Sequence, residues 1–303
     1  MSGLERFNYS NDLEAMIVHL HRGKESWPHY HLYIAAHLGG VNGRVSTFVQ
    51  FLCPEIAFRC GPLADKLVLD FGCGTGASSV ALALSGARVI AADICQESLE
   101  IARKRVQEHG LEDRVKFAAI DDLPMLQENG SFDLVLMNGV IEHIPTSDLG
   151  LRVKVLATAA NCLRRGGYLY ISETPNRLWP KDTHSTGLWF LPWTPAGSKI
   201  GYNYAISRGR HTECATLSQG PRGLEEVGAW GATYWELNAA LQGLGFRCKN
   251  AGSEQGQRVN FTYKGSAKRR IFEHVIYWLV TLPFGIPIIA FCPFLDHLVF
   301  VRE

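Results

Sequence analysis

The sequence lacks several features that would place it in a specialised class of protein. Its eight cysteines occur singly, at positions 53, 60, 73, 95, 162, 214, 248 and 292. With no C-x-x-C pair and no paired framework, a reducing compartment is favoured over a disulfide-stabilised secreted fold. No long basic run occurs and the formal net charge is +1, so nucleic acid is not an expected partner. Internal repeats and low-complexity tracts are also missing.

The N-terminal residues have no apolar core between their charges, so we expect no secretory signal and a cytoplasmic location. What is present is an ordinary globular composition. The 303 residues are 47% hydrophobic and 19% charged, which suits one large domain with insertions.

The most informative stretch runs from Leu67 to Gly76. The apolar residues Leu67 to Leu69 predict a fully buried strand of a parallel sheet, because such strands are covered on both faces. Asp70 ends this run, and glycines follow at 72, 74 and 76, where they permit a sharp turn and a close approach of a ligand to the main chain. A helix is predicted over Ala77 to Ser85. Strand, glycine loop and helix stand in the order of a nucleotide-type pocket.

The loop spacing distinguishes between two ligand classes. A dinucleotide site has the spacing G-x-G-x-x-G, whereas this loop is G-x-G-x-G with Asp70 two residues before it. A carboxylate there would repel a pyrophosphate but suits the ammonium and sulfonium of S-adenosylmethionine. Asp93 ends the next apolar run, Ala87 to Ala92, where an acidic side chain can accept hydrogen bonds from both ribose hydroxyls. An NAD-dependent dehydrogenase is therefore disfavoured.

With these motifs the chain resembles the class I, Rossmann-like, S-adenosylmethionine-dependent methyltransferases. Further blocks support the resemblance: Asp121 to Pro124 after a third strand, SFDLVLMNGVIEH (131–143) and LRRGGYLYISETPNR (163–177). The last two are most similar to the ubiquinone-pathway O-methyltransferases, in which a Glu-His pair follows the fourth strand. About half the chain is covered.

The resemblance implies S-adenosylmethionine as cofactor and a set of residues that bind it. Asp70 would lie near the methionyl end, the glycine loop beneath it, Asp93 on the ribose and Asp121 at the adenine amino group. The expected cofactor-binding residues are Asp70, Gly72, Cys73, Gly74, Gly76, Asp93, Ile94, Asp121, Asp122, Leu123, Asn138 and Gly139. For Asp121 and Asp122 a helix cap or turn is the alternative interpretation.

His143 is the first catalytic candidate, because it follows the fourth strand, where related enzymes present the methyl group. Its imidazole is a plausible base for a hydroxyl acceptor near neutral pH. Glu142 is its neighbour, and His184 and His211 are second choices as bases. The alternative is that Glu142 and His143 only cap the next segment, since positioning alone accelerates many methyl transfers. No convincing set of metal ligands is visible, so we expect no metal site.

Alternating strands and helices predict an α/β fold: a Rossmann-like seven-stranded sheet with helices on both faces, an N-terminal helical cap and C-terminal insertions. The fifth strand is expected at Gly167 to Ser172, the sixth at Phe246 to Ser253, and a seventh, antiparallel one at Leu295 to Glu303. The expected parts are a cap (1–64), the cofactor-binding core (65–173), an aromatic-rich substrate insertion (174–234) and the last two strands (235–303) with a hydrophobic insertion at 271–295.

Two aromatic-rich segments have open roles. Tyr30 and Tyr33 in the cap either lie over the cofactor or form the cap's own core. The tryptophans and tyrosines of 174–234 either wall a pocket for a ring or an isoprenoid-like chain or form the core of the insertion.

The segment from Val275 to Leu295 contains no charge and is long enough to span a bilayer. A crossing would prevent the seventh strand from joining the sheet, and Pro283, Gly285 and Pro287 would break a spanning helix. We therefore expect a hydrophobic hairpin. It would pack on the lid, contact a second copy, or dip into a membrane surface beside the basic residues that precede it.

Together these observations predict methyl transfer to a small, apolar or aromatic acceptor, with oxygen as the expected site. Alternatives are C-, N- or sugar methylation, and a protein of this fold that binds the cofactor for regulation or for a non-methylating reaction.

Overall fold

A computed structural model of the chain describes residues 9–22, 30–39, 43–122, 130–210, 220–250, 271 and 274–303. Among the candidate site residues named above, Leu123 and His211 lie outside the described residues.

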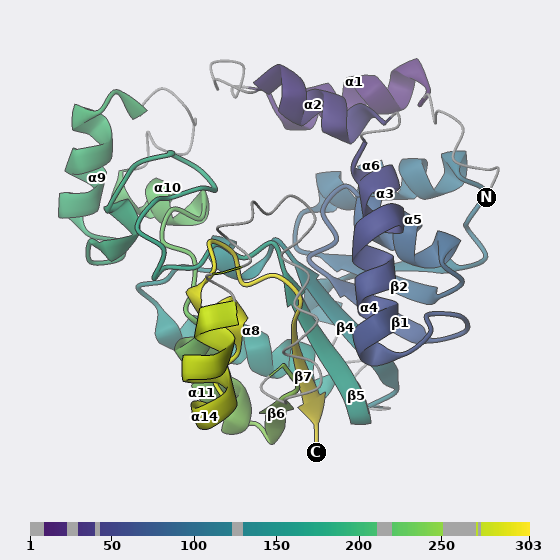
Figure 1. The fold of residues 1–303 in the computed structure, drawn as a ribbon. Coiled ribbons are helices and arrows are strands. Elements are labelled where there is room, and N and C mark those ends of the chain that lie inside the picture. Colours follow the sequence, from purple (N-terminus) through teal and green to yellow (C-terminus); the bar gives the residue numbers. More distant parts are fainter. Residues whose placement is uncertain are drawn as a thin grey trace.

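A seven-stranded sheet runs through the middle of the molecule (Figure 1). Its order is β3-β2-β1-β4-β5-β7-β6, with β7 antiparallel to both of its neighbours and the other pairs parallel. The strands are β1 (Leu67–Phe71), β2 (Arg88–Asp93), β3 (Val115–Ala119), β4 (Phe132–Asn138), β5 (Leu163–Ser172), β6 (Phe246–Cys248) and β7 (Leu298–Arg302). The predicted α/β sheet, including its antiparallel last strand, is confirmed.

Three strands differ in their bounds from the prediction, and one of them, β7, is Leu298–Arg302 instead of Leu295 to Glu303. β5 begins at Leu163 instead of Gly167, because a register shift in β4 lets Leu163 pair with Phe132 before the regular ladder starts at Tyr168. β6 ends at Cys248, well before Ser253.

Helices cover both faces of the sheet, and the strand residues alternate between two cores. Val68 faces a core built with α4, α5 and α6, whereas Leu69 faces a core built with α8 and α11. The helices are α1 (Asn11–Leu20), α2 (Tyr30–Leu38), α3 (Arg44–Thr47), α4 (Cys53–Cys60), α5 (Ala77–Leu84), α6 (Gln96–Glu108), α8 (Leu149–Asn161), α9 (Lys199–Ser207), α10 (Pro221–Glu226), α11 (Tyr234–Gln242) and α14 (Leu282–Phe284). This two-sided burial explains why the central strands read as continuous apolar runs.

Helices α1 and α2 form a cap at the top of Figure 1, above the carboxyl ends of the first strands. A buried arginine of α6 joins this cap to the glycine loop. Arg105 donates to the carbonyl oxygens of Thr75 at 2.8 Å and of His37 at 3.1 Å. Because these acceptors belong to the loop and to α2, one side chain fixes the cap over the loop.

The insertion after β5 folds around its own small core. Trp230 is buried at the centre of a cluster that includes Leu191 and Leu224, whereas Trp189 and Trp193 remain more than half exposed. Its aromatic side chains are therefore split between an internal core and the surface.

The charge-free segment near the C-terminus is helical rather than a simple hairpin. It contains a π-helix (Tyr277–Thr281) that continues into α14, and a 3-10 helix (Ile288–Phe291). Gly285 separates the two parts in a left-handed conformation with φ 66°. No helix among the described residues has the length and apolarity needed to cross a bilayer.

Candidate active site

A cavity of about 890 Å³ lies at the carboxyl ends of β1, β4 and β5. The cap, the glycine loop, the turn after β4, the insertion and the segment before β7 all contribute to its wall. Eight of the predicted site residues line it: Gly72, Cys73, Gly74, Asn138, Gly139, Glu142, His143 and His184. The structure therefore brings the predicted cofactor loop and all three predicted catalytic residues to one space.

The glycine loop has already used its main-chain donors inside the protein. The N–H groups of Gly72 and Cys73 both donate to the carbonyl oxygen of Ala92, at 2.8 and 3.0 Å. The N–H of Gly74 donates to Asp93 Oδ2 at 2.8 Å. A pyrophosphate site needs such groups free and pointing at the ligand. This accounting disfavours a dinucleotide and fits a ligand without phosphate.

Gly74 leaves room for a ligand above the loop. Its φ is +51°, and a Cβ built there would meet no atom within 4 Å. Gly76, by contrast, is needed for packing, because a Cβ there would lie 2.8 Å from the Cβ of Ala102. The glycines at 74 and 76 thus serve ligand access and helix packing respectively.

Asp70 does not line the cavity, so it is not placed to contact a cofactor there directly. Its carboxylate is 1% exposed and accepts hydrogen bonds from Ser78 Oγ at 2.7 Å and Ser79 Oγ at 2.5 Å. The two serines begin α5, so the side chain ties the strand to the helix beneath the loop. Burial raises the pKa of Asp70 to about 6, although the two serine hydroxyls oppose the shift.

We expect Asp70→Asn to remove a pH-dependent loss of stability. Because the pKa of Asp70 is raised on folding, the proton's stabilising contribution is complete below pH ~4 and is lost as pH rises through about 6. The difference amounts to roughly 3 kcal/mol at 1.36 kcal/mol per pKa unit. Urea unfolding at pH 4 and pH 7.5 should therefore show a smaller decrease for the variant than for the wild type. Equal decreases in the two proteins would contradict this account.

The other predicted residues lie outside the cavity wall. The carboxylate of Asp93 accepts two main-chain hydrogen bonds. Oδ2 accepts from Gly74 N–H at 2.8 Å and Oδ1 accepts from Cys95 N–H at 2.9 Å. Ile94 is 82% exposed, and Asp121 and Asp122 are exposed in a single 3-10 turn after β3. Their roles toward ribose and adenine stay predictions.

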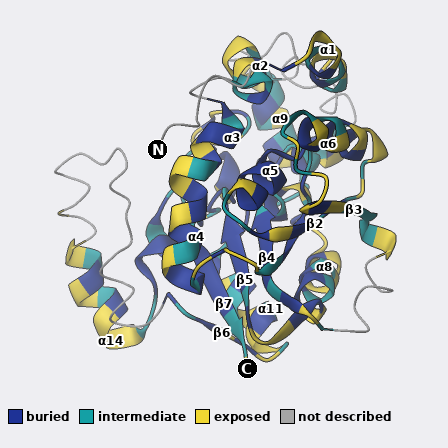
Figure 2. Ribbon diagram, turned by 90° about the vertical axis from the view of Figure 1, so that its right-hand side faces the viewer, coloured by how far each residue is buried: buried dark blue, intermediate teal, exposed yellow. Residues whose placement is uncertain are grey.

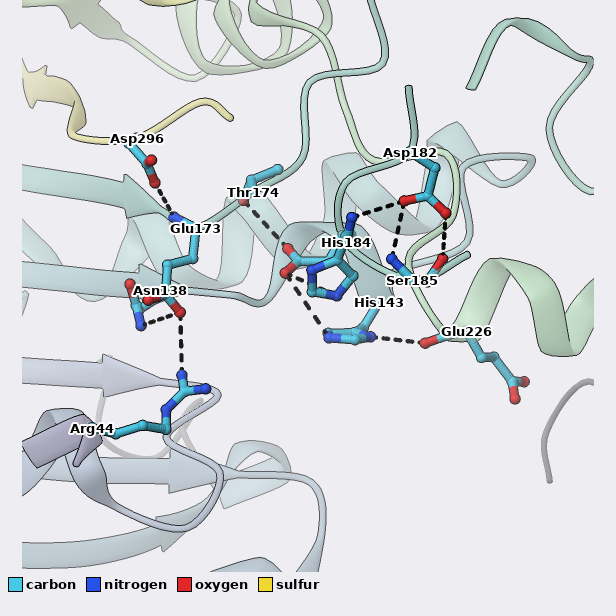
Figure 3. Close-up of polar contacts among 11 residues, drawn as sticks. Arg44, Asn138, His143, Glu173, Thr174, Asp182, His184, Ser185, Glu226 and Asp296 are labelled. Atoms are coloured by element: carbon cyan, nitrogen blue, oxygen red, sulfur yellow. Dashed lines mark hydrogen bonds and ion pairs between the residues drawn. The ribbon is translucent and has the colours of Figure 1, made fainter. Parts of the chain in front are cut away.

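At the cavity wall, a buried carboxylate faces two imidazoles. We call Glu142, His143 and His184 the Glu142 cluster. Glu142 Oε1 lies 3.9 Å from His143 Nε2 and 4.0 Å from His184 Nε2. Figure 3 shows the two imidazoles facing each other from the turn after β4 and from the insertion. Their ring centroids are 5.5 Å apart in an edge-to-face arrangement.

Hydrogen bonding fixes the state of these groups. His143 Nδ1 is 2.8 Å from the main-chain oxygen of Glu226. Because that oxygen only accepts, Nδ1 carries a proton, and Nε2 of the same ring faces Glu142. Burial and the neighbouring His143 lower the pKa of His184 to about 4, which keeps that ring neutral. Burial raises the pKa of Glu142 to about 8.

The prediction of no metal site stays a prediction, and the structure adds one candidate group of ligands among the described residues. One atom from each member of the Glu142 cluster lies within 4.8 Å of the others, which makes this a group that could hold a metal ion. Glu142 Oε1 is buried and has no hydrogen-bond partner among the described residues, and a buried carboxylate oxygen normally has one. Two imidazole nitrogens and a carboxylate oxygen suit a divalent transition metal, and the main-chain bond of His143 is the usual support of a ligating imidazole. The site fits a cation.

The insertion is shaped to bring His184 here. Asp182 is buried and accepts from the N–H groups of His184 and Ser185 at 2.9 and 3.0 Å, which fixes the turn that carries the imidazole (Figure 3). Gly228 closes over the cluster, and a Cβ there would lie 2.9 Å from both Glu142 Cγ and His184 Cδ2. Local turn chemistry and one glycine thus complete a cluster whose members are 41 residues apart.

Arg44 and Glu173 also line the cavity, and sequence reasoning missed both. Glu173 Oε2 accepts from Arg44 Nη2 and from Asn138 Nδ2, each at 3.2 Å. Glu173 has a left-handed backbone with φ 56°, held by a 2.7 Å bond from its N–H to Asp296 Oδ1. The only sequence signal was the position of Glu173 directly after β5. These contacts join the cap, β4, β5 and the segment before β7 at the cavity.

Curated relatives match less than half of the chain. A ubiquinone biosynthesis O-methyltransferase of Xylella fastidiosa is 32% identical over 139 residues, which are 41% of this chain and 54% of that protein. A methyltransferase of Streptomyces halstedii, GfsG, is 38% identical over 111 residues, covering 36% of this chain and 38% of that protein. The chain thus spans about half the length of the ubiquinone-pathway relatives it matches.

A solved structure, magnesium protoporphyrin IX methyltransferase from Synechocystis with bound SAH, has a TM-score of 0.42 and 22% identity, and covers 67% of this chain and 72% of that one. The profile of the family described as "Methyltransferase domain" matches residues 68–167. This range contains the glycine loop, Asp93, Glu142 and His143. Residues 68–167, about a third of the chain, are therefore similar to the methyltransferase domain family.

Proposed function

We propose that this protein transfers a methyl group from S-adenosylmethionine to a hydroxyl oxygen of a small, apolar or aromatic acceptor. The observation that carries the proposal is the shared cavity, which has Gly72 to Gly74 on one side and the Glu142 cluster on the other. The loop suits a cationic donor, because its main-chain donors are already bonded and Asp70 lies beneath it. The proposed oxygen preference draws support from the ubiquinone-pathway relatives.

In the proposed reaction the acceptor oxygen attacks the methyl carbon, the carbon–sulfur bond breaks, and S-adenosylhomocysteine leaves with the sulfur's electron pair. The chain holds the two reactants in line, which supplies much of the acceleration. In one version of the step His143 Nε2 takes the hydroxyl proton, because Nδ1 is bonded to the oxygen of Glu226. In the other version, the Glu142 cluster would hold a divalent cation through His143 Nε2, and the cation would act as a Lewis acid that makes the acceptor hydroxyl easier to deprotonate.

The aromatic side chains of the insertion do not form the wall of the acceptor site in this structure. Within its described residues, the insertion contributes His184, Ser185, Glu226 and Val227 to the cavity, and none of its tryptophans. Apolar and aromatic surface comes instead from the cap and the segment before β7, through Tyr33, Phe48 and Phe294. Tyr33, rather than Tyr30, is the cap tyrosine at the cavity.

The test is turnover by the full chain with S-adenosylmethionine and a panel of phenols, alkylated phenols, amines and sugars. We expect S-adenosylhomocysteine only when a phenolic acceptor is present, and mass spectrometry of the product to place the methyl group on oxygen. Chelation should reduce turnover and added Mn²⁺, Zn²⁺ or Mg²⁺ should restore it. Calorimetry of each cation with the apoprotein gives a readout that does not depend on turnover.

The outcomes separate the alternatives. No affinity for S-adenosylmethionine or S-adenosylhomocysteine would overturn the proposal completely. Methylation of the amines or sugars would retain the enzyme and change the acceptor. Tight cofactor binding with no product from any acceptor would favour a regulatory or non-methylating protein of this fold.

We also infer that the protein works in a reducing compartment, with the cytoplasm as the expected location. None of the cysteines that the structure describes forms a disulfide, and most of them are buried. Burial raises the pKa of the Cys53 thiol to about 11, which makes it a poor nucleophile.

A further inference from the structure

The helical segment before Gly285 exposes an apolar stripe that the proposed reaction does not use. Val275, Trp278, Leu279 and Leu282 are 47%, 60%, 66% and 49% exposed. Their spacing of three and four residues puts them on one side of the helical segment 274–284. Phe284 extends the stripe at its end and is 72% exposed.

The opposite side of this segment is attached to the protein. Tyr277 and Thr281 are buried, and Tyr277 packs against Ile288 and Cys292. Figure 2 shows α14 at the edge of the molecule with exposed positions along its outer side. The stripe is therefore held outward by packing on the inner side and is not a loosely attached strand of chain.

Charge in the sequence around the stripe has one predominant sign. Lys264, Lys268, Arg269 and Arg270 precede the segment, whereas Glu273 is the only carboxylate between positions 264 and 295. Such a combination of basic residues and an apolar helical stripe suits a surface that is anionic outside and apolar beneath. Trp278 adds a side chain that favours the boundary between headgroups and acyl chains.

We propose that this stripe, residues 275–284, docks the protein onto an anionic lipid surface. The helix would lie in the plane of the membrane, because its eleven residues span only about 16 Å at 1.5 Å per residue, half of a hydrocarbon core. A second copy of this chain is a poorer occupant. A twofold contact would bring the stripe against itself and offer no negative charge to the predominantly basic sequence that precedes it.

The chain that follows the stripe reaches the cavity wall. The segment continues from Gly285 to Phe294 and Asp296, and both of these residues line the cavity. The proposal does not depend on methyl transfer, because it concerns a surface that any ligand of the cavity would leave unchanged.

The test uses the full chain and flotation with two kinds of vesicle, phosphatidylcholine alone and phosphatidylcholine with 30% phosphatidylglycerol. We expect binding to the anionic vesicles that is at least tenfold tighter than to the neutral ones and that weakens as salt rises. The double variant Trp278→Gln/Leu279→Gln should lose at least tenfold in affinity for the anionic vesicles, because both side chains are mainly exposed and leave the fold intact. Ile200→Gln/Leu149→Gln is the matched control, with two equally exposed apolar residues elsewhere on the surface.

Circular dichroism and thermal unfolding should be the same for all three proteins. Two results would overturn the proposal: no binding to either vesicle, or binding that the Trp278/Leu279 variant keeps. Sedimentation that shows a wild-type dimer broken by the same variant would assign the stripe to a second copy instead.

Discussion

Glu142→Gln is expected to reduce turnover at least about a hundredfold while leaving cofactor affinity within a factor of two or three. Glu142 Oε1 lies 3.9 Å from His143 Nε2 and 4.0 Å from His184 Nε2. In its ionised form the carboxylate can therefore stabilise either a cation or an imidazolium formed in the reaction. Glutamine keeps the volume and accepts the hydrogen bond from Thr174, but it carries no charge. Losses of 10²–10⁴ are typical when an acid–base group is removed. Turnover and calorimetry with S-adenosylhomocysteine measure the two effects separately.

The same variant should fold as well as the wild type. Because burial raises the pKa of Glu142 to about 8, the side chain is largely protonated at pH 7 in the cation-free protein, and glutamine resembles that neutral acid. The thermal midpoint should therefore stay the same or rise. Glu100→Gln, the same change at an exposed position of α6, controls for the loss of one surface charge. Full activity in Glu142→Gln, or a loss of cofactor binding, would contradict the assigned role.

Single and double histidine variants show whether the cluster acts as one unit. If the three side chains hold a cation, His143→Gln and His184→Gln should each be nearly as damaging as the double variant, since residues that act together are strongly non-additive. If His143 alone acts as a base, His184→Gln should lower turnover only slightly. Cation calorimetry on the same variants gives the matching result without a substrate.

Asp93→Ala is expected to weaken S-adenosylhomocysteine binding about a hundredfold. The carboxylate accepts from Gly74 N–H and Cys95 N–H at 2.8 and 2.9 Å, so its removal loosens the loop under the ligand as well as removing the predicted ribose acceptor. Hydrogen bonds to charged groups contribute about 1.5–3 kcal/mol each, and a hundredfold loss equals about 2.7 kcal/mol. Isothermal calorimetry on the purified variant gives the affinity directly.

Asp93→Asn should weaken cofactor binding almost as much as Asp93→Ala. An amide oxygen keeps one main-chain bond, but the amide N–H₂ opposes the other donor, so the loop should be disturbed almost as much as by alanine. Asp113→Ala, in an exposed turn between α6 and β3, is the control and should bind normally. Unchanged affinity in Asp93→Ala would place the cofactor away from this loop.

The core of the fold could be predicted because its strands are buried on both faces. Continuous apolar runs occur at Leu67 to Leu69 and at Val89 to Ala92. Glycine and aspartate mark the turns that follow these runs. The ends of the strands were harder to predict from the sequence. β5 starts at Leu163 because of a register shift opposite Phe132, and such a pairing detail has no local sequence signal.

The Glu142 cluster shows where sequence reasoning stops. His143 was found from its position after β4, and His184 was only one of several histidines in a long insertion. Nothing in the sequence said that Asp182 would turn the chain to aim His184 at Glu142, or that Gly228 would let a loop close over them. The sequence did not show this candidate group of metal ligands, because ligands from two distant segments have no fixed spacing.

Asp70 shows a further limit, because it was expected beside the methionyl end of the cofactor and its hydrogen-bond partners within the protein had no signal in the sequence. Ser78 and Ser79 were expected only as helix residues. In the structure their hydroxyls donate hydrogen bonds to the carboxylate of Asp70 and hold it away from the cavity.

The sequence by itself determined the order of strands and helices, the glycine loop and the family of the core, because local propensity and burial periodicity act over a few residues at a time. Only the tertiary structure decided which groups meet: Arg105 with the cap, Arg44 with Glu173, and Glu142 with two histidines. These contacts join segments separated by tens of residues or more, and their distances depend on how whole layers pack. Chemistry that needs two or three groups within 5 Å is therefore set at that level.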